Sequence, residues 1–226
     1  MTATTSPEPR PEIWVNCAAS ADGRIAFADG ARARLSSPED LARLQRMRSQ
    51  VDGILVGVGT VVLDDPSLRV HWELIGGARG TEPTRIIVDG SGRTPEKARV
   101  LDGSIPTIVA TTERAHRRYP PHVRIVVAGT HRVDLGRLFA HLLGLGLRRV
   151  LVEGGAQILA SVIGEGRFDR FTVYYAPVLI GAERAPPIIA GPAASSLDAV
   201  RRLELVGLER LGEGYVATYV PRRPGS

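Results

Sequence analysis

The sequence is poor in cysteine, in lysine and in long hydrophobic runs. Cys17 is the only cysteine among 226 residues, which excludes an intramolecular disulfide, a cysteine-based zinc site and a dithiol redox pair. No window reaches the roughly eighteen consecutive apolar residues of a membrane-spanning helix, and the start, MTATTSPEPRPE, lacks the apolar core of a signal peptide. We therefore expect a cytoplasmic protein with no membrane partner and no metal site.

Positive charge is in excess but is not concentrated in one segment. Lys97 is the only lysine, and the net charge of +5 is carried by arginines that stand between acids, as in SPEDLARLQRMRSQ. Nucleic-acid-binding surfaces need clustered cations, and no extended run of like charge is present. We expect no nucleic-acid partner. Surplus arginine fits a small anionic ligand equally well.

Apolar runs alternate with helical patterns along the chain, which is typical of an α/β fold. The length and the 43% hydrophobic content fit one domain, which we place at residues 12–221, between a flexible N-terminal tail at 1–11 and a C-terminal tail at 222–226. A helix is predicted to begin at Pro38, because Ser37 is a good N-cap and Glu39 and Asp40 lie in the first turn. Two further helices are predicted over 133–147 and 156–166. The predicted strands are 12–20, 51–59, 84–90, 105–112, 122–129, 148–155 and 169–181.

The last strands decide the sheet type. Residues 169–181 are continuously apolar, which indicates either a central strand or one that meets a second subunit. Residues 201–220 alternate on both sides of LGEG, as in an antiparallel hairpin. We therefore predict a mixed, mostly parallel sheet, flanked by helices and ending in that hairpin.

Two predicted strands end in glycine, in VGVGT (56–60) and VEGGA (152–156). Ligands of parallel sheets bind at the carboxyl ends of the strands, and glycine lets a ligand approach the backbone. The helix beginning near Ala156 would direct its positive end at an anion such as a diphosphate. For each motif alone an ordinary tight turn is the favoured interpretation, and neither motif matches the G-x-G-x-x-G fingerprint or a Walker loop.

Six blocks, taken in order, resemble a known family: NCAASADGRIA, SSPEDLARLQRMRSQVDGILVGVGTVVLDDPSL, TRIIVDGSGRTP, VLVEGG, APVLIGAERAP and LERLGEGY. They are similar to the riboflavin-biosynthesis reductases of the dihydrofolate-reductase-like fold, over about 13–220, and most of all to the stand-alone archaeal type. The resemblance implies NADPH-dependent reduction of 2,5-diamino-6-(ribosylamino)-4(3H)-pyrimidinone 5′-phosphate to its ribitylamino form by a homodimer. The zinc deaminase to which bacterial members are commonly fused needs more than one cysteine.

The resemblance also implies a cofactor site. Thr60 and Asp64 would contact NADPH from a Gly-Thr…Asp-Asp-Pro loop, in which Asp65 and Pro66 are structural. Arg93 is our candidate for the 2′-phosphate, although a surface arginine is an alternative. The remaining implied cofactor residues are Val88, Asp89, Gly90, Ser91, Ala128, Gly129, Gly154, Gly155 and Ala156.

For the substrate, the resemblance implies Glu153 before the glycines, which either binds the pyrimidine and acts in catalysis or is a buried acid paired with an arginine. Glu153, Asp22 and water are the open choices for the proton donor. Arg48, with a neighbour, would hold the substrate phosphate. Asn16, Leu68 and His71 complete the implied substrate contacts.

Three other functions remain open from the sequence. The first is reduction of the deaminated 5-amino-6-(5-phosphoribosylamino)uracil, which differs by an amino group against a carbonyl. The second is a paralogous NADPH reductase of another carbonyl or imine. The third is a non-catalytic module that binds a nucleotide or a nucleic acid.

Overall fold

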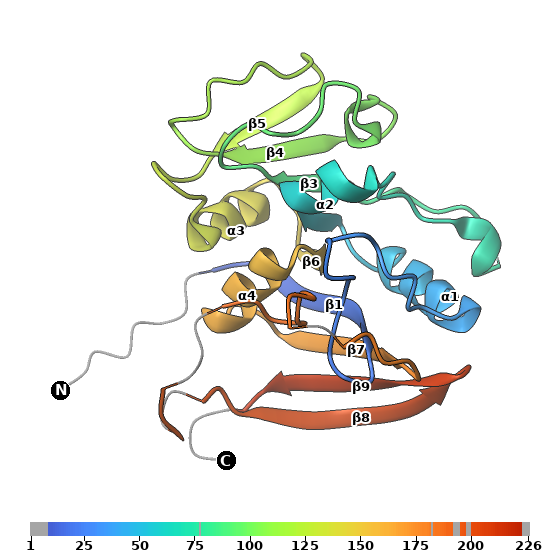
Figure 1. The fold of residues 1–226 in the computed structure, drawn as a ribbon. Helices are drawn as coiled ribbons and strands as arrows, with labels where there is room; N and C mark the ends of the chain where they lie inside the picture. Colours follow the sequence, from blue (N-terminus) through green and yellow to red (C-terminus); the bar gives the residue numbers. More distant parts are fainter. Residues whose placement is uncertain (1–8, 77, 182, 192–194, 198–199, 223–226) are drawn as a thin grey trace.

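The computed structural model describes residues 9–76, 78–181, 183–191, 195–197 and 200–222. A nine-stranded sheet runs through it in the order β5-β4-β3-β2-β6-β1-β7-β9-β8 (Figure 1). Every neighbouring pair from β5 to β7 is parallel, whereas β9 is antiparallel to both β7 and β8. The predicted mixed, mostly parallel sheet with a C-terminal antiparallel hairpin is therefore confirmed.

The strands and helices alternate through most of the chain. The strands are β1 (Glu12–Ser20), β2 (Gly53–Gly57), β3 (Thr84–Val88), β4 (Thr107–Thr111), β5 (Val123–Val127), β6 (Arg149–Gly154), β7 (Arg170–Ala176), β8 (Leu203–Leu211) and β9 (Gly214–Pro221). The helices are α1 (Pro38–Arg48), α2 (Val58–Asp64), α3 (Leu135–Gly144) and α4 (Ala156–Gly164), with short 3₁₀ turns at Trp72–Leu74 and Arg99–Leu101.

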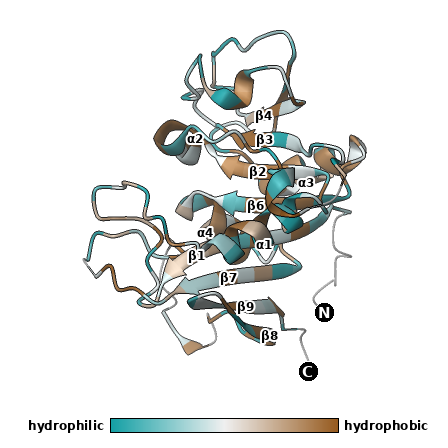
Figure 2. Cartoon of the chain, turned by 90° about the vertical axis from the view of Figure 1, so that its right-hand side faces the viewer, coloured by the Kyte–Doolittle hydropathy of each residue, from teal (hydrophilic) through white to brown (hydrophobic). Residues whose placement is uncertain are grey.

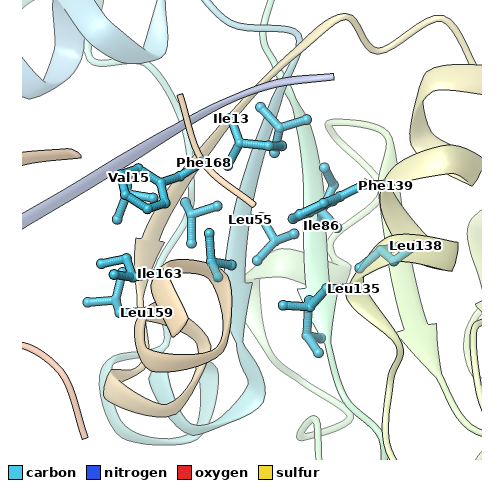
Figure 3. Packing of buried hydrophobic residues seen from close by; sticks show 14 of the residues in the cluster. Ile13, Val15, Leu55, Ile86, Leu135, Leu138, Phe139, Leu159, Ile163 and Phe168 are labelled. Atoms are coloured by element: carbon cyan, nitrogen blue, oxygen red, sulfur yellow. The ribbon is translucent and has the colours of Figure 1, made fainter. Parts of the chain in front are cut away.

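Helices cover both faces of the parallel part of the sheet (Figure 1). On one face, Leu138 and Phe139 of α3 and Leu159 of α4 pack with Leu55 and Ile86 of the strands (Figure 3). The other face carries α1, α2 and the second 3₁₀ turn. Because both faces are covered, the central strands are apolar on both sides, as β2 shows in Figure 2.

The signals at the start of α1 are confirmed in detail. The Ser37 side chain accepts a hydrogen bond from the Asp40 backbone N–H, and Pro38 is the first helical residue. On this helix Leu44 and Met47 pack against the core, but Leu41 is exposed. The helix therefore meets the sheet mainly through its C-terminal half.

The apolar strand β7 lies inside the sheet, between β1 and β9. Phe171, Val173 and Tyr174 are buried within the chain itself. Residues 170–176 of the predicted run thus form an inner strand, whereas Val178 and Leu179 beyond it are exposed. No helix in the described residues is long and apolar enough to cross a membrane.

Candidate active site at the carboxyl edge of the sheet

The two glycine-rich strand ends lie side by side. Strand β2 pairs with β6, and Gly57 follows the last paired residues of β2. A Cβ placed on Gly155 would lie 3.6 Å from the Gly57 Cα, and one placed on Gly154 would lie 3.2 Å from the Thr60 hydroxyl oxygen. The two sequence motifs, about ninety residues apart, thus lie in contact beside the start of α4. Gly155 also has φ +87°, a conformation that favours glycine.

The predicted loop after β2 is a helix. Residues Val58–Asp64 form α2, because Val58 and Val61 are buried, and Val61 packs into the core on the α1 face of the sheet. Thr60 lies on this helix and faces Gly154, whereas Asp64 is its exposed last residue. The predicted structural role of Asp65 is supported by contacts: it ends the helix at φ 38°, and its carboxylate accepts a hydrogen bond from the Arg99 N–H at 2.8 Å.

Leu68 follows this helix and is 2% exposed, with φ 48°. A left-handed conformation is uncommon for leucine, and its free-energy cost must be compensated by the surrounding packing. Its side chain belongs to the core cluster on the α1 face. The predicted substrate residue is therefore a buried core residue, held in a strained turn between α2 and the first 3₁₀ turn.

The turn after β3 is built around Asp89. This fully buried carboxylate accepts hydrogen bonds from the Arg93 and Thr94 N–H groups, the Thr94 hydroxyl and the Tyr119 hydroxyl. Burial alone would raise the pKa of Asp89, but these hydrogen bonds lower it below its ordinary value. Asp89 thus fixes the turn. The other predicted residues of this segment divide into Val88, which is buried, Gly90, which is partly buried, and Ser91 and Arg93, which are exposed.

The turn after β5 requires glycine. Gly129 has φ +131°, and a Cβ there would lie 2.2 Å from the Arg132 carbonyl oxygen. The preceding Ala128 is buried, and the Gly129 carbonyl accepts a hydrogen bond from the Glu113 N–H at 3.0 Å. Gly129 also lines a surface hollow of about 440 Å³ with Arg132 and Asp134. The ends of β4 and β5 are therefore held together next to the turn after β3.

The centre of the site is an ion pair between α1 and β6. Arg48 donates to both Glu153 carboxylate oxygens, at 2.7 and 2.6 Å, and also donates to the Arg69 carbonyl oxygen at 2.7 Å. The two paired side chains are only 11% and 9% exposed. Burial by itself would lower the pKa of Arg48, but the Glu153 carboxylate outweighs it and raises that pKa. The arginine partner that the sequence left open for Glu153 is present, and it is Arg48.

Asn16 lies next to Glu153. The last aligned pair of β1 and β6 is Val15 with Val152, so the two polar residues follow it on adjacent strands. Arg43 of α1 donates to the Asn16 amide oxygen at 2.8 Å and is itself paired with the buried Asp40. Neither Arg43 nor Asp40 was predicted from the sequence, because only the packing of α1 brings them to Asn16.

Asp22 lies in the loop after β1 and does not join this pair. Its carboxylate accepts hydrogen bonds from the Ser20 hydroxyl at 2.6 Å and from the Ile180 and Gly181 N–H groups at 3.1 and 2.8 Å. These bonds lower the pKa of Asp22 to about 2. Its contacts link the loop after β1 to the loop after β7.

His71 is the most exposed of the predicted substrate residues, with a side chain 48% exposed. Its ring nitrogen Nδ1 lies 3.0 Å from Glu73, and its backbone N–H donates to the buried Gln45 of α1. Gln45 was not predicted as a site residue. Its hydrogen bond links the segment containing His71 to the helix that carries Arg48.

Known proteins are similar to this chain along most of its length. The family described as the RibD C-terminal domain matches residues 11–217. A 2,5-diamino-6-ribosylamino-4(3H)-pyrimidinone 5′-phosphate reductase of Methanothermobacter thermautotrophicus is 37% identical, covering 93% of this chain and 98% of that protein. The protein of the same name from Archaeoglobus fulgidus is 35% identical, covering 92% and 97%.

Solved structures share the fold. The deaminase/5-amino-6-(5-phosphoribosylamino)uracil reductase of Thermotoga maritima superposes with a TM-score of 0.82 at 25% identity. The superposed region covers 94% of this chain and 57% of the Thermotoga maritima chain. Rib7 of Saccharomyces cerevisiae superposes with a TM-score of 0.75 at 21% identity, covering 97% and 93%. The resemblance seen in the sequence blocks is confirmed, and the chain belongs to the RibD C-terminal domain family.

Proposed function

We propose that this protein reduces 2,5-diamino-6-ribosylamino-4(3H)-pyrimidinone 5′-phosphate to its ribitylamino form, with NADPH as the reductant. The observation that carries the proposal is the buried Arg48–Glu153 pair beside the glycine-lined ends of β2 and β6. The named reductases that match along nearly their whole length support the same substrate. When bound, NADPH would supply the hydride for C1′ of the ribosyl group.

The chain's own residues would bind and orient the reactants. Gly154, Gly155 and the start of α4 let a dinucleotide approach the backbone, and the helix dipole favours its diphosphate. Thr60 on α2, which faces Gly154, would add a hydroxyl to the same site. Ala156, the turn at 88–91 and Ala128 with Gly129 would line the rest of the cofactor site.

Glu153 is the residue we propose to contact the pyrimidine. A carboxylate accepts hydrogen bonds from ring amino groups, and the Arg48 guanidinium holds it in one orientation. Reduction also needs one proton, which neutralises the sugar oxygen released from C1′. With a pKa of about 2, Asp22 is ionised at neutral pH, so we propose that it positions the two loops and leaves the donor role to Glu153 or to water.

Arg48 is less suited to hold the substrate phosphate than its charge alone indicates. Three of its five N–H groups are used, two by Glu153 and one by the Arg69 carbonyl. We propose that its main role is to hold Glu153 against the substrate. His71 and Leu68 remain our predictions for the wall of the substrate site.

The deaminated uracil is the second candidate substrate, and Asn16 favours it. Because Arg43 occupies the Asn16 amide oxygen, the amide N–H groups are the part left to meet a ligand, and these suit a carbonyl. Glu153, in contrast, suits an amino group. The two neighbouring residues therefore favour opposite ring substituents.

The deciding experiment follows loss of NADPH absorbance with the diamino compound and its deaminated counterpart in parallel. Turnover of the diamino compound alone would support the main proposal. A preference for the deaminated compound would replace it with the second candidate. If NADPH binds but neither compound is reduced, the substrate assignment is wrong, and a paralogous reductase or a non-catalytic nucleotide-binding module takes its place.

Asp64→Ala is expected to raise the Kd of NADPH about tenfold, because a carboxylate hydrogen bond to the cofactor is lost. Asp65→Ala is the matched control. Since Asp65 caps α2 and binds the Arg99 N–H, its loss should lower the melting temperature and leave the Kd nearly unchanged. Titration calorimetry with both variants checks this. Equal NADPH affinity in the parent and in Asp64→Ala would remove Asp64 from the cofactor site.

We also propose that the protein is a homodimer. Strand β8 is an edge of the sheet, and Leu205, Val206 and Leu208 on it are 52%, 51% and 66% exposed. An exposed apolar edge strand is a common site of self-association. Light scattering on the eluting protein should give twice the chain mass of 24.3 kDa. A single-chain mass at micromolar concentration would contradict the proposal.

A further inference from the structure

An arginine from the segment after β4 lies against the turn after β3, which itself carries an arginine. Arg93 lies in that turn, and Arg117 lies in the segment after β4. A Cβ on Gly92 would lie 2.9 Å from the Arg117 Cβ, so Arg117 passes directly over the turn backbone. No local pattern of the sequence predicts this contact, because Arg117 is 25 positions from Gly92.

Arg117 is ordered by its surroundings. Its guanidinium lies 5.7 Å from the centre of the Tyr119 ring, and the Tyr119 hydroxyl donates to the buried Asp89. Gly92, at φ +71°, leaves the space that the Arg117 stem occupies. Tyr119 therefore connects the position of Arg117 to Asp89, the carboxylate that fixes the turn after β3.

Among the residues that the structure describes, the Arg117 guanidinium has no carboxylate partner. Within the described residues it makes no hydrogen bond or ion pair, and its Nε is buried without a hydrogen-bond partner. An arginine that is partly buried, fixed and unpaired is costly unless an anion completes it. Arg93 differs, because its side chain is exposed and must lose rotamer entropy to bind.

The turn after β3 and the turns after β4 and β5 are held together at this place. The Thr112 hydroxyl donates to the Gly90 carbonyl oxygen at 2.6 Å, and the Glu113 N–H donates to the Gly129 carbonyl. Gly90 and Gly129 are two of the residues that we propose for the cofactor. Arg117 thus adjoins the proposed cofactor site on the side of β3 and β4, away from Glu153 on β6.

We propose that Arg117, assisted by Arg93, binds the 2′-phosphate of the cofactor and is the residue that discriminates NADPH from NADH. The inference rests on the proposed function, since it names a subsite of the same cofactor site. A phosphomonoester next to a fixed guanidinium gains charge-assisted hydrogen bonds that a ribose hydroxyl does not offer.

The test uses two fragments and two cofactors on the full chain. Binding of 2′,5′-ADP and of 5′-AMP is measured by titration calorimetry, and kcat/KM is measured with NADPH and NADH. Arg117→Gln should weaken 2′,5′-ADP about 10- to 100-fold and leave 5′-AMP unchanged. The NADPH-to-NADH ratio of kcat/KM should fall by a similar factor. Arg117→Lys should retain part of the preference, because it keeps the charge.

The control is Arg124→Gln, which removes an exposed arginine near the amino end of β5 and should change none of these values. Arg93→Gln should reduce the preference for 2′,5′-ADP less than Arg117→Gln does. If Arg117→Gln keeps the parent's preference for 2′,5′-ADP, or if the parent has none, the inference is wrong. Failure of the parent to reduce either pyrimidine would instead contradict the proposed function, while the fragment measurements would still judge Arg117.

Discussion

Glu153→Gln is expected to lower kcat about 100-fold, with little change in the Kd of NADPH. The substitution keeps the shape of the side chain but removes the charge that we propose to contact the substrate. It also replaces one of the two carboxylate oxygens that accept hydrogen bonds from Arg48 by an NH₂ group, which cannot accept one. Turnover should therefore fall through loss of both the acceptor for the pyrimidine and its orientation. Steady-state kinetics with the pyrimidine substrate, together with NADPH titration, separates the two quantities.

A matched control exists at the opposite edge of the sheet. Glu12 forms a similar pair with Arg149 at 2.7 Å, and both side chains are about 40% exposed. Glu12→Gln should leave kcat near the parent value, because this pair lies at the amino end of β1, away from the glycine-rich carboxyl ends of β2 and β6. If Glu153→Gln and Glu12→Gln both turn over like the parent, Glu153 has no role in the reaction.

Asp102→Asn is expected to give the largest loss of stability, about 2–3 kcal/mol. Its partner Arg85 is completely buried on β3, and Asp102 accepts from it at 2.7 Å. Within the described residues, two of the Arg85 nitrogens already lack a hydrogen-bond partner. Removing the carboxylate would leave a buried, uncompensated charge. The loss of stability should be smaller than for a fully buried ion pair, because the Asp102 side chain is 41% exposed.

Thermal unfolding should show this as a decrease in Tm of roughly 5–10 °C. Arg85→Met tests the cause, since replacing the buried cation by an apolar side chain should cost less than breaking the pair, and Asp102→Asn in that background should have little effect. If Asp102→Asn is equally harmful with and without Arg85, the pair is not the reason.

The same pair predicts a pH dependence. The hydrogen bond from Arg85, followed by those from Ser104, lowers the pKa of Asp102 below its ordinary value despite partial burial. A carboxyl with a lowered pKa in the folded state contributes stability above its unfolded pKa, about 3.9, and loses it as the pH falls further. The difference in Tm between the parent and Asp102→Asn should therefore be full at pH 7 and shrink below about pH 4. A difference that stays constant to pH 2 would contradict this assignment.

The helix α2 shows why one segment was misread. Residues 56–68 contain two glycines near the start and Asp-Asp-Pro near the end, which locally favour loops. An isolated seven-residue helix is unstable in water. It forms because Val58 and Val61 are buried against the sheet, a gain that no local pattern of the sequence expresses.

The sequence by itself determined the elements and the family. The Ser37–Pro38 start of α1, the apolar runs of the central strands and the alternation of the hairpin are local patterns, and each specifies its element through neighbouring residues. The two glycine motifs likewise predicted where a ligand could approach the backbone. The six sequence blocks indicated the family, because they match its residue types in the same order over nearly the whole chain.

Only the tertiary structure decided which charges meet. Arg48 and Glu153 are 105 positions apart, Asp22 and Gly181 are 159 apart, and Arg117 reaches Gly92 across two strand ends. Strand order and helix packing set these distances, and no local spacing encodes them. The role of a charged side chain depends on its partners, so Asp22 became a link between loops and Arg48 the partner of Glu153 once the sheet had brought distant segments together.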